Sequence, residues 1–317
     1  MRTPFGGDSW YEAATGRLRR LGRRLPRRRN SRAAIVRRLE QLERLSRGGN
    51  ATYVGNNRLL TRLMVDDIML ALLVEADDLL IVPHFTMTGV HEAWATRFFL
   101  DNVKPHHHCL DIGANFGYFT CLLGQLATKG KTIGIEPQRH AYELLRDNIY
   151  INNLQSTVTS INAAVGASRG ALILYRRHTR SGNTSIIKVS GDDVRPIGEA
   201  TPEPFEIDAV SIDDLLPEFD HRIDIIKIDV EGAEPLVFRG AQLAIATNPQ
   251  VKISMEWSPG QITHAGFDPG EFVKELDRMG LQVAAVRPGV PGGPKPVTFD
   301  QLLATPYHPG VLLTLRS

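Results

Sequence analysis

The sequence is poor in cysteine and has no long apolar run. Its two cysteines, Cys109 and Cys121, lack the CxxC spacing of a metal-binding pair, so we expect reduced thiols and a cytoplasmic location rather than a disulfide framework. The best candidate for a transmembrane segment, 68–74, is cut short by Glu75 and falls below the ~18 apolar residues that a bilayer requires. With 42% hydrophobic and 23% charged residues, the composition also excludes a wholly disordered or collagen-like chain.

The net charge is also small, +2 over 317 residues, but it is unevenly distributed. Residues 1–47 hold 14 arginines, no lysine and four acidic residues, which gives +10, whereas residues 48–317 hold 23 basic and 31 acidic residues, which gives −8. We predict that residues 1–31 form a flexible basic arm, because like charges repel and there is little to bury. A solvated tail is the first interpretation. Contact with nucleic acid or an anionic membrane surface, and an organelle transit peptide, are the alternatives.

Residues 32–104 are predicted to form a lead-in subdomain. Apolar residues at helical spacing indicate an amphipathic helix from about residue 33 to residue 47. Short apolar runs separated by acidic turns follow, and a second helix is expected over 91–103. On that helix Trp94, Phe98 and Phe99 have helical spacing and are expected to lie in the core.

Residues 105–317 alternate strand-like and helix-like segments. Helices are predicted at 116–128, at 138–151, from residue 230 to about 246, and at 270–279. Strands are predicted at 109–112, 131–136, up to residue 161, near 171–176, 184–189 and 206–211, and at 223–229, 251–257, 281–286 and 311–315. This alternation predicts an α/β fold with a doubly wound, Rossmann-like sheet, mostly parallel and with an antiparallel last strand.

The first predicted strand is followed by the motif Asp111-Ile-Gly113-Ala-Asn115-Phe-Gly117. Ligands of open α/β sheets bind beyond the carboxyl ends of the strands, where this turn lies. Gly113 and Gly117 are expected to let the backbone approach a ligand closely. The spacing is not the GxGxxG of dinucleotide-binding folds, and Asp111 would attract a cation rather than a diphosphate.

An acidic residue also ends the second predicted strand. Glu136 follows Asp111 by 25 residues, and an acid at this position can accept hydrogen bonds from both hydroxyls of a ribose. The pocket therefore suits a nucleoside that carries positive charge and no phosphate. S-adenosylmethionine, a sulfonium, is the cofactor that we expect.

The runs CLDIGANFGYFT, GIEP, INAAVG and IIKIDVEGAEPLVFRGA resemble the FkbM family of S-adenosylmethionine-dependent methyltransferases, over about residues 105–286. IDVEGAE is the most family-specific of these runs, whereas the first motif alone indicates the wider superfamily. The resemblance implies an enzyme that O-methylates a hydroxyl of a saccharide, glycolipid or secondary metabolite, as in polysaccharide biosynthesis. Its acceptor would be a small molecule or a glycan.

The resemblance also implies roles for individual residues. Asp229, Glu231 and Glu234 match an acidic cluster close to the methyl acceptor. The remaining matches are to cofactor-binding positions, with the last two next to the adenine: Asp111, Gly113, Asn115, Gly117, Glu136, Asn162 and Ala163.

Methyl transfer to an alcohol depends on positioning and gains from a proton acceptor. Asp229 and Glu231 are the leading candidates for that acceptor, although Glu231 could instead cap the next helix and Asp229 could hold the amine of the cofactor. Glu256, at the end of the fifth strand, is predicted to face the rim of the pocket and to bind substrate. His178 and His264, in loops over the site, are further candidates for substrate contact.

No resident metal is expected. The side chains of His106, His107 and His108 would alternate in direction on a strand entry and so would not converge; a hard cation held by Asp229, Glu231 and Glu256 is the alternative. Two other functions stay open. A nucleic-acid methyltransferase could use the basic arm, but no [DN]PP[YFW] motif follows the fourth strand and no Pro-Cys nucleophile is present. A non-catalytic protein that binds S-adenosylmethionine is the other.

Overall fold

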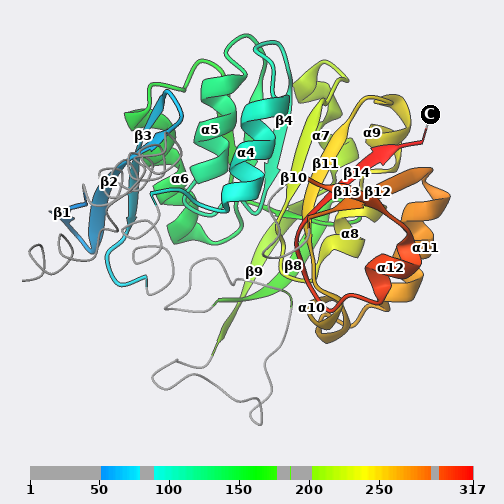
Figure 1. Ribbon diagram of the computed structural model, residues 1–317. Helices are drawn as coiled ribbons and strands as arrows, with labels where there is room; N and C mark the ends of the chain where they lie inside the picture. The colour runs from blue at the N-terminus through cyan, green and yellow to red at the C-terminus, as the bar shows by residue number, and fades with distance from the viewer. Residues whose placement is uncertain (1–50, 79–88, 177–185, 187–201, 287–292, 317) are drawn as a thin grey trace, which may run out of the picture. The chain divides into compact units, whose positions relative to one another are not determined.

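A computed structural model of the chain describes residues 51–78, 89–176, 186, 202–286 and 293–316 (Figure 1). All of them belong to one compact unit. The predicted basic arm, the helix predicted near residues 33–47 and His178 lie outside the described residues, as does most of the strand-like run 184–189.

The centre of the fold is an eight-stranded sheet with the order β13-β12-β14-β11-β10-β4-β5-β6. β14 (His308–Leu315) runs antiparallel to both of its neighbours, and β13 (Lys295–Val297) is antiparallel at one edge. The other strands run in one direction: β4 (Cys109–Ile112), β5 (Thr132–Ile135), β6 (Val158–Ile161), β10 (Ile225–Ile228), β11 (Lys252–Trp257) and β12 (Leu281–Ala285). The predicted mostly parallel, Rossmann-like sheet is confirmed, and β13 is an addition to it.

The central strands are buried on both faces. Every residue of β4, β5 and β10 is buried, which explains their nearly continuous apolar sequences. Asp111 in β4 and Lys227 in β10 are the charged exceptions, and they are register partners on adjacent strands. Their side chains therefore lie on the same face of the sheet.

Helices cover the sheet on both sides. One apolar core contains residues of α4 (Ala93–Asn102), α5 (Tyr118–Leu126) and α6 (Arg139–Ile151). The other contains residues of seven helical elements: α7 (Ile212–Leu215), η2 (Leu216–Phe219), α8 (Glu234–Arg239), α9 (Gln242–Thr247), α10 (Pro259–His264), α11 (Pro269–Arg278) and α12 (Phe299–Leu303). The single helix predicted up to residue 246 is wrong, because it breaks into α8 and α9 at Gly240, where a Cβ would overlap the carbonyl oxygen of Gly166.

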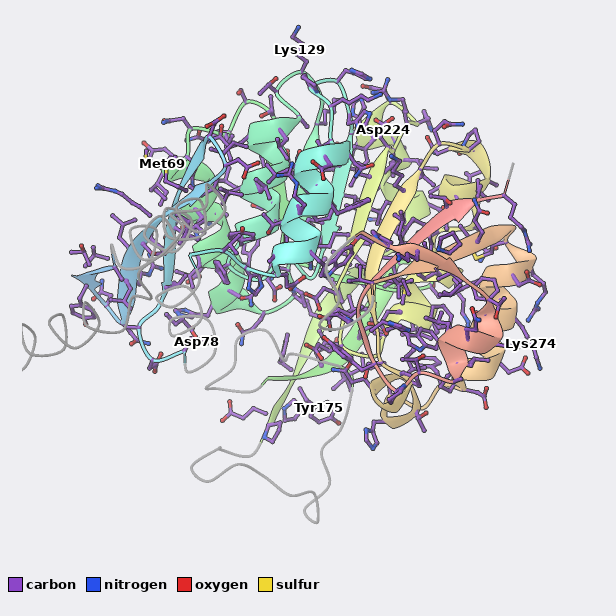
Figure 2. The ribbon with its side chains drawn as sticks, in the orientation of Figure 1. Met69, Asp78, Lys129, Tyr175, Asp224 and Lys274 are labelled. Atoms are coloured by element: carbon purple, nitrogen blue, oxygen red, sulfur yellow. The ribbon has the colours of Figure 1, made fainter. Side chains whose placement is uncertain are left out.

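The lead-in region begins with an antiparallel meander of β1 (Thr52–Gly55), β2 (Arg58–Val65) and β3 (Ile68–Glu75). Its inner face joins the core of α5 and α6, whereas Met69 is exposed on the outer face (Figure 2). The free edge of β3 is closed by α6: Asn148 exchanges hydrogen bonds with the backbone of Leu73, and Asn152 does so with Ala71, at 2.6–3.0 Å. These side chains take the place of a neighbouring strand.

Helix α4 connects the lead-in region to the C-terminal strand. Phe98 and Phe99 are buried, as predicted, and Trp94 is only partly buried. The indole Nε1 of Trp94 donates a hydrogen bond to the carbonyl oxygen of Pro309 at 2.6 Å. A Cβ at Gly310 would overlap the same indole ring. This contact fixes the start of α4 close to the ends of β10 and β11.

A third, three-stranded sheet follows β6. Its order is β7 (Ala164–Val165), β9 (Glu203–Val210) and β8 (Gly170–Arg176). Cys109 and Cys121 are buried and form no disulfide. Within the described ranges, no helix has the length and apolar character needed to cross a bilayer.

Candidate functional site

A cavity opens at the carboxyl ends of β4, β10 and β11, with an empty volume of about 710 Å³ that includes space open to solvent. Its walls are the turn after β4, the end of β10 with the residues that follow it, Glu256 of β11, and the lead-in residues Asp78 (Figure 2), His91 and Glu92. This is the edge of the sheet at which doubly wound folds bind ligands.

Five of the residues singled out from the sequence meet at this cavity. They are Gly113, Asn115, Asp229, Glu231 and Glu256. They come from three separate strand ends, and the parallel register of β4, β10 and β11 brings them together.

Asp111 does not line the cavity, because it lies inside the sheet. The side chain is fully buried, and its Oδ2 accepts a hydrogen bond from the Thr120 hydroxyl at 2.6 Å. Burial raises the pKa of Asp111, and the nearby ammonium of Lys227 opposes that rise. The carboxylate of Asp111 therefore influences the site through its attraction to the ammonium of Lys227.

The two glycines of the first motif permit close packing within the protein. Gly113 has φ 76° and Gly117 has φ 93°, values that favour glycine. A Cβ at Gly113 would overlap the backbone carbonyl of Asp229, and one at Gly117 would overlap the side chain of Leu145. Both glycines thus permit a close approach within the chain itself, and their predicted contact with the cofactor stays a prediction. In this way Gly113 joins the turn after β4 to the turn after β10.

Glu136 ends β5 below the turn of the first motif. Its two carboxylate oxygens accept hydrogen bonds from the backbone N–H groups of Asn115 and Gln138, each at 2.8 Å. Burial raises its pKa to about 7. The side-chain amide of Asn162 donates to the carbonyl oxygens of Glu136 and Pro137, at 2.8 and 3.0 Å.

Glu136, Asn162 and the buried Ala163 do not line the cavity, and neither does Gly117. The predicted ribose and adenine contacts of the first three stay predictions.

Lys227 is the functional candidate that the sequence analysis missed. It is the third residue of β10 and is buried, with its Nζ 2.9 Å from Oδ2 of Asp229 and 4.9 Å from the centre of the Phe119 ring. Burial alone would lower the pKa of Lys227, but the carboxylates of Asp229, Glu92 and Asp111 outweigh burial and hold the pKa above its usual value. A lysine in a central apolar strand is itself a signal, since lysine is almost never fully buried without a partner.

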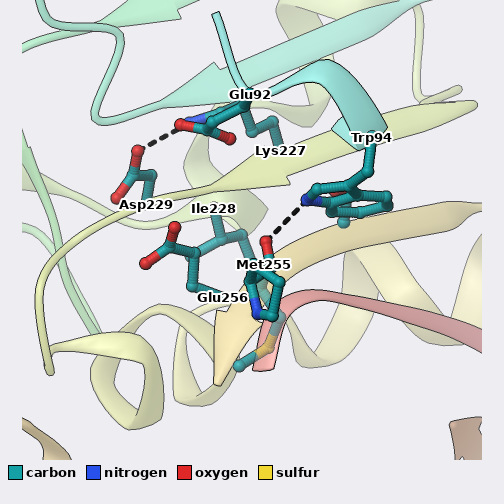
Figure 3. A pocket seen from close by; sticks show the side chains of 9 residues that line it. Glu92, Trp94, Lys227, Ile228, Asp229, Met255 and Glu256 are labelled. Atoms are coloured by element: carbon teal, nitrogen blue, oxygen red, sulfur yellow. Dashed lines mark hydrogen bonds and ion pairs between the residues drawn. The ribbon is translucent and has the colours of Figure 1, made fainter. Parts of the chain in front are cut away.

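Glu256 faces the cavity from β11. The Tyr307 hydroxyl, just before β14, donates to its Oε1 at 3.2 Å. Burial and the like charges of Asp229 and Glu92 raise the pKa of Glu256 to about 8. Figure 3 shows the carboxylates of Glu92, Asp229 and Glu256 around one space, in an adjoining narrow pocket that Trp94 borders.

Glu231 lies in the turn after β10 and has φ 53°. Its Oε2 accepts a hydrogen bond from the side-chain amide of Gln261, in α10 (Pro259–His264). The alternative that Glu231 caps the next helix is wrong: the acidic residue in the first turn of α8 is Glu234, which is buried and accepts from the N–H of Gly232 at 3.2 Å. Glu231 therefore lines the cavity and does not cap α8.

His264 is the last residue of α10, is exposed and does not line the cavity. Its predicted position in a loop over the site is therefore wrong. In the described part of the chain, no three histidine, cysteine, aspartate or glutamate side chains are grouped to hold a metal ion.

The family comparison covers most of the residues around this cavity. The model of the methyltransferase FkbM domain matches residues 111–283, which is more than half of the chain. The chain belongs to the FkbM methyltransferase family. The matched residues of this FkbM domain include the turn after β4, all of β10 and Glu256, and so most of the cavity wall.

Two curated relatives are similar to part of this chain. Methyltransferase sdnD of Sordaria araneosa is 28% identical over 160 residues, which cover 44% of this chain and 62% of the relative. Methyltransferase 1 of Beauveria bassiana (strain ARSEF 2860) is 27% identical over 142 residues, which cover 41% of this chain and 57% of the relative. The match thus spans about three fifths of the length of each relative.

Solved structures resemble the chain only distantly. M. jannaschii TYW2 in complex with AdoMet has a TM-score of 0.39 and 13% identity, covering 83% of this chain and 86% of that one. The O-methyltransferase from Bacillus cereus in complex with SAH has a TM-score of 0.38 and 13% identity, covering 67% of this chain and 75% of that one. The strand order, not these scores, identifies the fold.

FkbM domains are S-adenosylmethionine-dependent, and the cavity residues fit a sulfonium cation. Among the described residues, the carboxylates of Asp78, Glu92, Asp229, Glu231 and Glu256 line it together with the ammonium of Lys227. In addition, Oδ1 of Asp111 is buried and has no hydrogen-bond partner among the described residues. An excess of negative charge stabilises a bound cation.

Proposed function

We propose that the protein is an S-adenosylmethionine-dependent methyltransferase that transfers a methyl group to a hydroxyl oxygen of a saccharide, glycolipid or secondary metabolite. The observation that carries this proposal is the carboxylate-lined cavity at the strand ends of an FkbM domain. A cytoplasmic location is part of the proposal and is supported by two buried cysteines without a disulfide.

In this proposal one side of the cavity binds the methyl donor and the other side binds the acceptor. In this proposal the turn with Gly113 and Asn115 lies against the methionine part of the donor, Glu136 accepts hydrogen bonds from the ribose, and Asn162 and Ala163 border the adenine. The acidic groups at the ends of β10 and β11 then face the acceptor. When bound, the donor supplies an electrophilic methyl group on a positively charged sulfur.

Holding the two reactants in line supplies most of the acceleration of such a transfer. An alcohol is also a weak nucleophile at neutral pH and must lose a proton during the reaction. Of the carboxylates that line the cavity, Asp229, Glu231 and Glu256 lie at the ends of β10 and β11, on the side proposed for the acceptor, and are the candidates to accept it. Asp229 and Glu231 are the candidates that the sequence analysis favours.

The first test is binding of S-adenosylmethionine to the full chain, measured by calorimetry. We expect saturable binding to the wild type and at least about tenfold weaker binding to Glu136→Ala, because two charge-assisted hydrogen bonds from the ribose would be lost. Glu143→Ala, which removes an exposed carboxylate that pairs with Arg139 on α6, is the matched control and should bind normally. Absence of binding to the wild type would overturn the proposed function.

The second test is a screen with S-adenosylmethionine that carries a labelled methyl group. Cell extract is separated into polysaccharide, lipid, small-molecule and nucleic-acid fractions before incubation. We expect label in one of the first three, in an alkali-stable form, as a methyl ether would be. Label in nucleic acid would support the alternative that uses the basic arm. Binding without transfer to any fraction would support the non-catalytic alternative.

A further inference from the structure

We propose that Glu256, positioned by Tyr307, is the residue that takes the proton from the acceptor hydroxyl. The inference rests on the proposed function and goes beyond it, because it selects one of three carboxylates. Asp229 and Glu231, which the sequence favours, then have other tasks.

Asp229 is committed to Lys227. Its Oδ2 lies 2.9 Å from the Lys227 ammonium, whose side chain is only 5% exposed. A proton on Asp229 would leave that buried ammonium with one partner fewer, and an uncompensated buried charge is costly. Asp229 is therefore suited to hold Lys227 in place and to keep negative charge near the donor. It is poorly suited to gain and lose a proton in each cycle.

Glu231 is held at the rim by a neutral donor. The side-chain amide of Gln261 donates to its Oε2, and a hydrogen bond to the charged form of a carboxylate favours that form. Glu231 lies in the turn after β10 and Gln261 lies in the short helix α10, so both are outside the sheet. Glu231 is thus placed to contact an acceptor at the mouth of the cavity.

Glu256 differs from Asp229 and Glu231 in its position and in the charges that surround it. It is on the strand itself, and like charges face it from two other elements: Asp229 after β10 and Glu92 before α4. The ammonium of Lys227 counteracts the effect of these like charges, and the Tyr307 hydroxyl donates a hydrogen bond to Glu256. Burial together with the like charges raises the pKa of Glu256 to about 8. A proton acceptor is most effective when its pKa lies near the working pH.

Tyr307 fixes the direction of this carboxylate. Its hydroxyl donates a hydrogen bond to Oε1 at 3.2 Å, and Oε2, to which no described residue donates, is the oxygen that we assign to the acceptor. Burial, together with the charge of Glu256, raises the pKa of Tyr307, so the phenol stays a donor. The nearby bond from Trp94 to the carbonyl oxygen of Pro309 holds the segment that carries Tyr307. Tyr307 is accordingly a positioning residue, and Glu256 is the catalytic one.

The proposed step is balanced without any further reactant. A lone pair of the hydroxyl oxygen forms the new C–O bond while the bond between the methyl carbon and the sulfur breaks. The electron pair of that bond goes to the sulfur, which loses its positive charge. The hydroxyl proton goes to Oε2 of Glu256, which becomes neutral and later releases the proton to solvent through the open side of the cavity.

The protonation of Glu256 can be measured without an acceptor. Infrared difference spectra of the full chain, recorded from pH 5 to pH 10, report the C=O band of protonated carboxyl groups. We expect a band that disappears with a midpoint near pH 8 in the wild type and in Glu231→Gln, and that is missing in Glu256→Gln. Glu136 and Glu234, whose pKa values burial raises to about 7, remain in all three proteins and cancel in the comparison. An unchanged band in Glu256→Gln would overturn the assignment.

The rate of transfer gives the second readout, with the labelled donor at saturation and the fraction identified in the screen as acceptor. At pH 8.5 Glu256→Gln should lower kcat about 100-fold or more, the usual contribution of a proton acceptor, while donor affinity by calorimetry at pH 6.5, where Glu256 of the wild type is also neutral, changes less than about twofold. Normal kcat in Glu256→Gln, with donor binding intact, would overturn this inference alone. Failure of the wild type to bind the donor would instead overturn the proposed function.

Two neighbours of Glu256 should move the pH profile in opposite directions. The rate requires ionised Glu256 and should rise with a midpoint near its pKa. Tyr307→Phe removes a donor that favours the anion, so the midpoint should move to higher pH. Glu92→Gln removes a like charge, so the midpoint should move to lower pH. A merely structural role of Glu256 would not produce this pair of opposite shifts, and their absence would contradict the inference.

Discussion

At the scale of single residues, Lys227 links the buried and the open parts of the site. It is the register partner of Asp111 on β4 and the ion-pair partner of Asp229 at the cavity. The sequence predicted Asp229 and Glu256 at strand ends, because an apolar strand followed by an acid is visible as a pattern. It did not predict the burial of Asp111 or the importance of Lys227. Both depend on which strands are neighbours and in which register, and periodicity within one strand contains neither.

Loss of the Lys227 charge should destabilise the protein. Lys227→Met leaves the carboxylates of Asp229 and Asp111 without their cation, and breaking a buried ion pair costs roughly 3–5 kcal/mol. Because the Asp229 side chain is 28% exposed, we expect about 2–3 kcal/mol in the free energy of unfolding, measured by urea denaturation. Lys274→Met, which removes an exposed pair with Glu271, should cost less than about 0.5 kcal/mol. Equal losses in the two variants would contradict this account of Lys227.

At the scale of helices and strands, α6 does more than cover the sheet. Its apolar face was predictable from periodicity, whereas the role of Asn148 and Asn152 was not, because they bond to a meander more than 70 residues earlier in the chain. The turns of that meander could have been recognised, since Asn56, Asn57 and Asp66 have positive φ values that asparagine and aspartate tolerate. Only the pairing of helix and strand edge requires the tertiary structure.

Replacement of Asn148 should therefore open the edge of β3. Asn148→Leu removes the partners of the N–H and C=O of Leu73 and of the C=O of Phe116. A buried polar group left without a partner costs about 1–3 kcal/mol. We therefore expect the free energy of unfolding to fall by about 3 kcal/mol in total, and hydrogen exchange in β3, measured by mass spectrometry, to become faster. Gln155→Ala, at an exposed amide near the end of α6, is the control. Unchanged exchange in β3 would show that the two asparagines do not hold this edge.

At the scale of the whole molecule, negative charge is concentrated where the donor is proposed to bind. Residues 48–317 carry −8, and the described residues that line the cavity include five carboxylates, Asp78, Glu92, Asp229, Glu231 and Glu256, and one lysine. The sequence could predict the sign of the charge of this part of the chain. It could not predict that Asp78 and Glu92, from the lead-in region, would join acids from β10 and β11. The hydrogen bond from Trp94 of α4 to the C-terminal strand is one of the contacts that hold the lead-in residues close to the strand ends.

This field should distinguish S-adenosylmethionine from S-adenosylhomocysteine, which differ in the charge on sulfur and share every other ionisable group. The pKa of Glu256 is raised to about 8, so the cavity gains negative charge as the pH rises from 6.5 to 8.5. Affinity for the sulfonium should increase over this range relative to the neutral thioether, by roughly tenfold for one added charge about 10 Å from the sulfur at an effective dielectric constant near 20. Calorimetry with both ligands at both pH values measures the ratio of the two Kd values, in which the titration of their common amine cancels. Glu256→Gln should make the ratio nearly independent of pH. If the Kd of S-adenosylhomocysteine divided by that of S-adenosylmethionine rises with pH equally in the wild type and in Glu256→Gln, the titrating charge belongs to a residue other than Glu256.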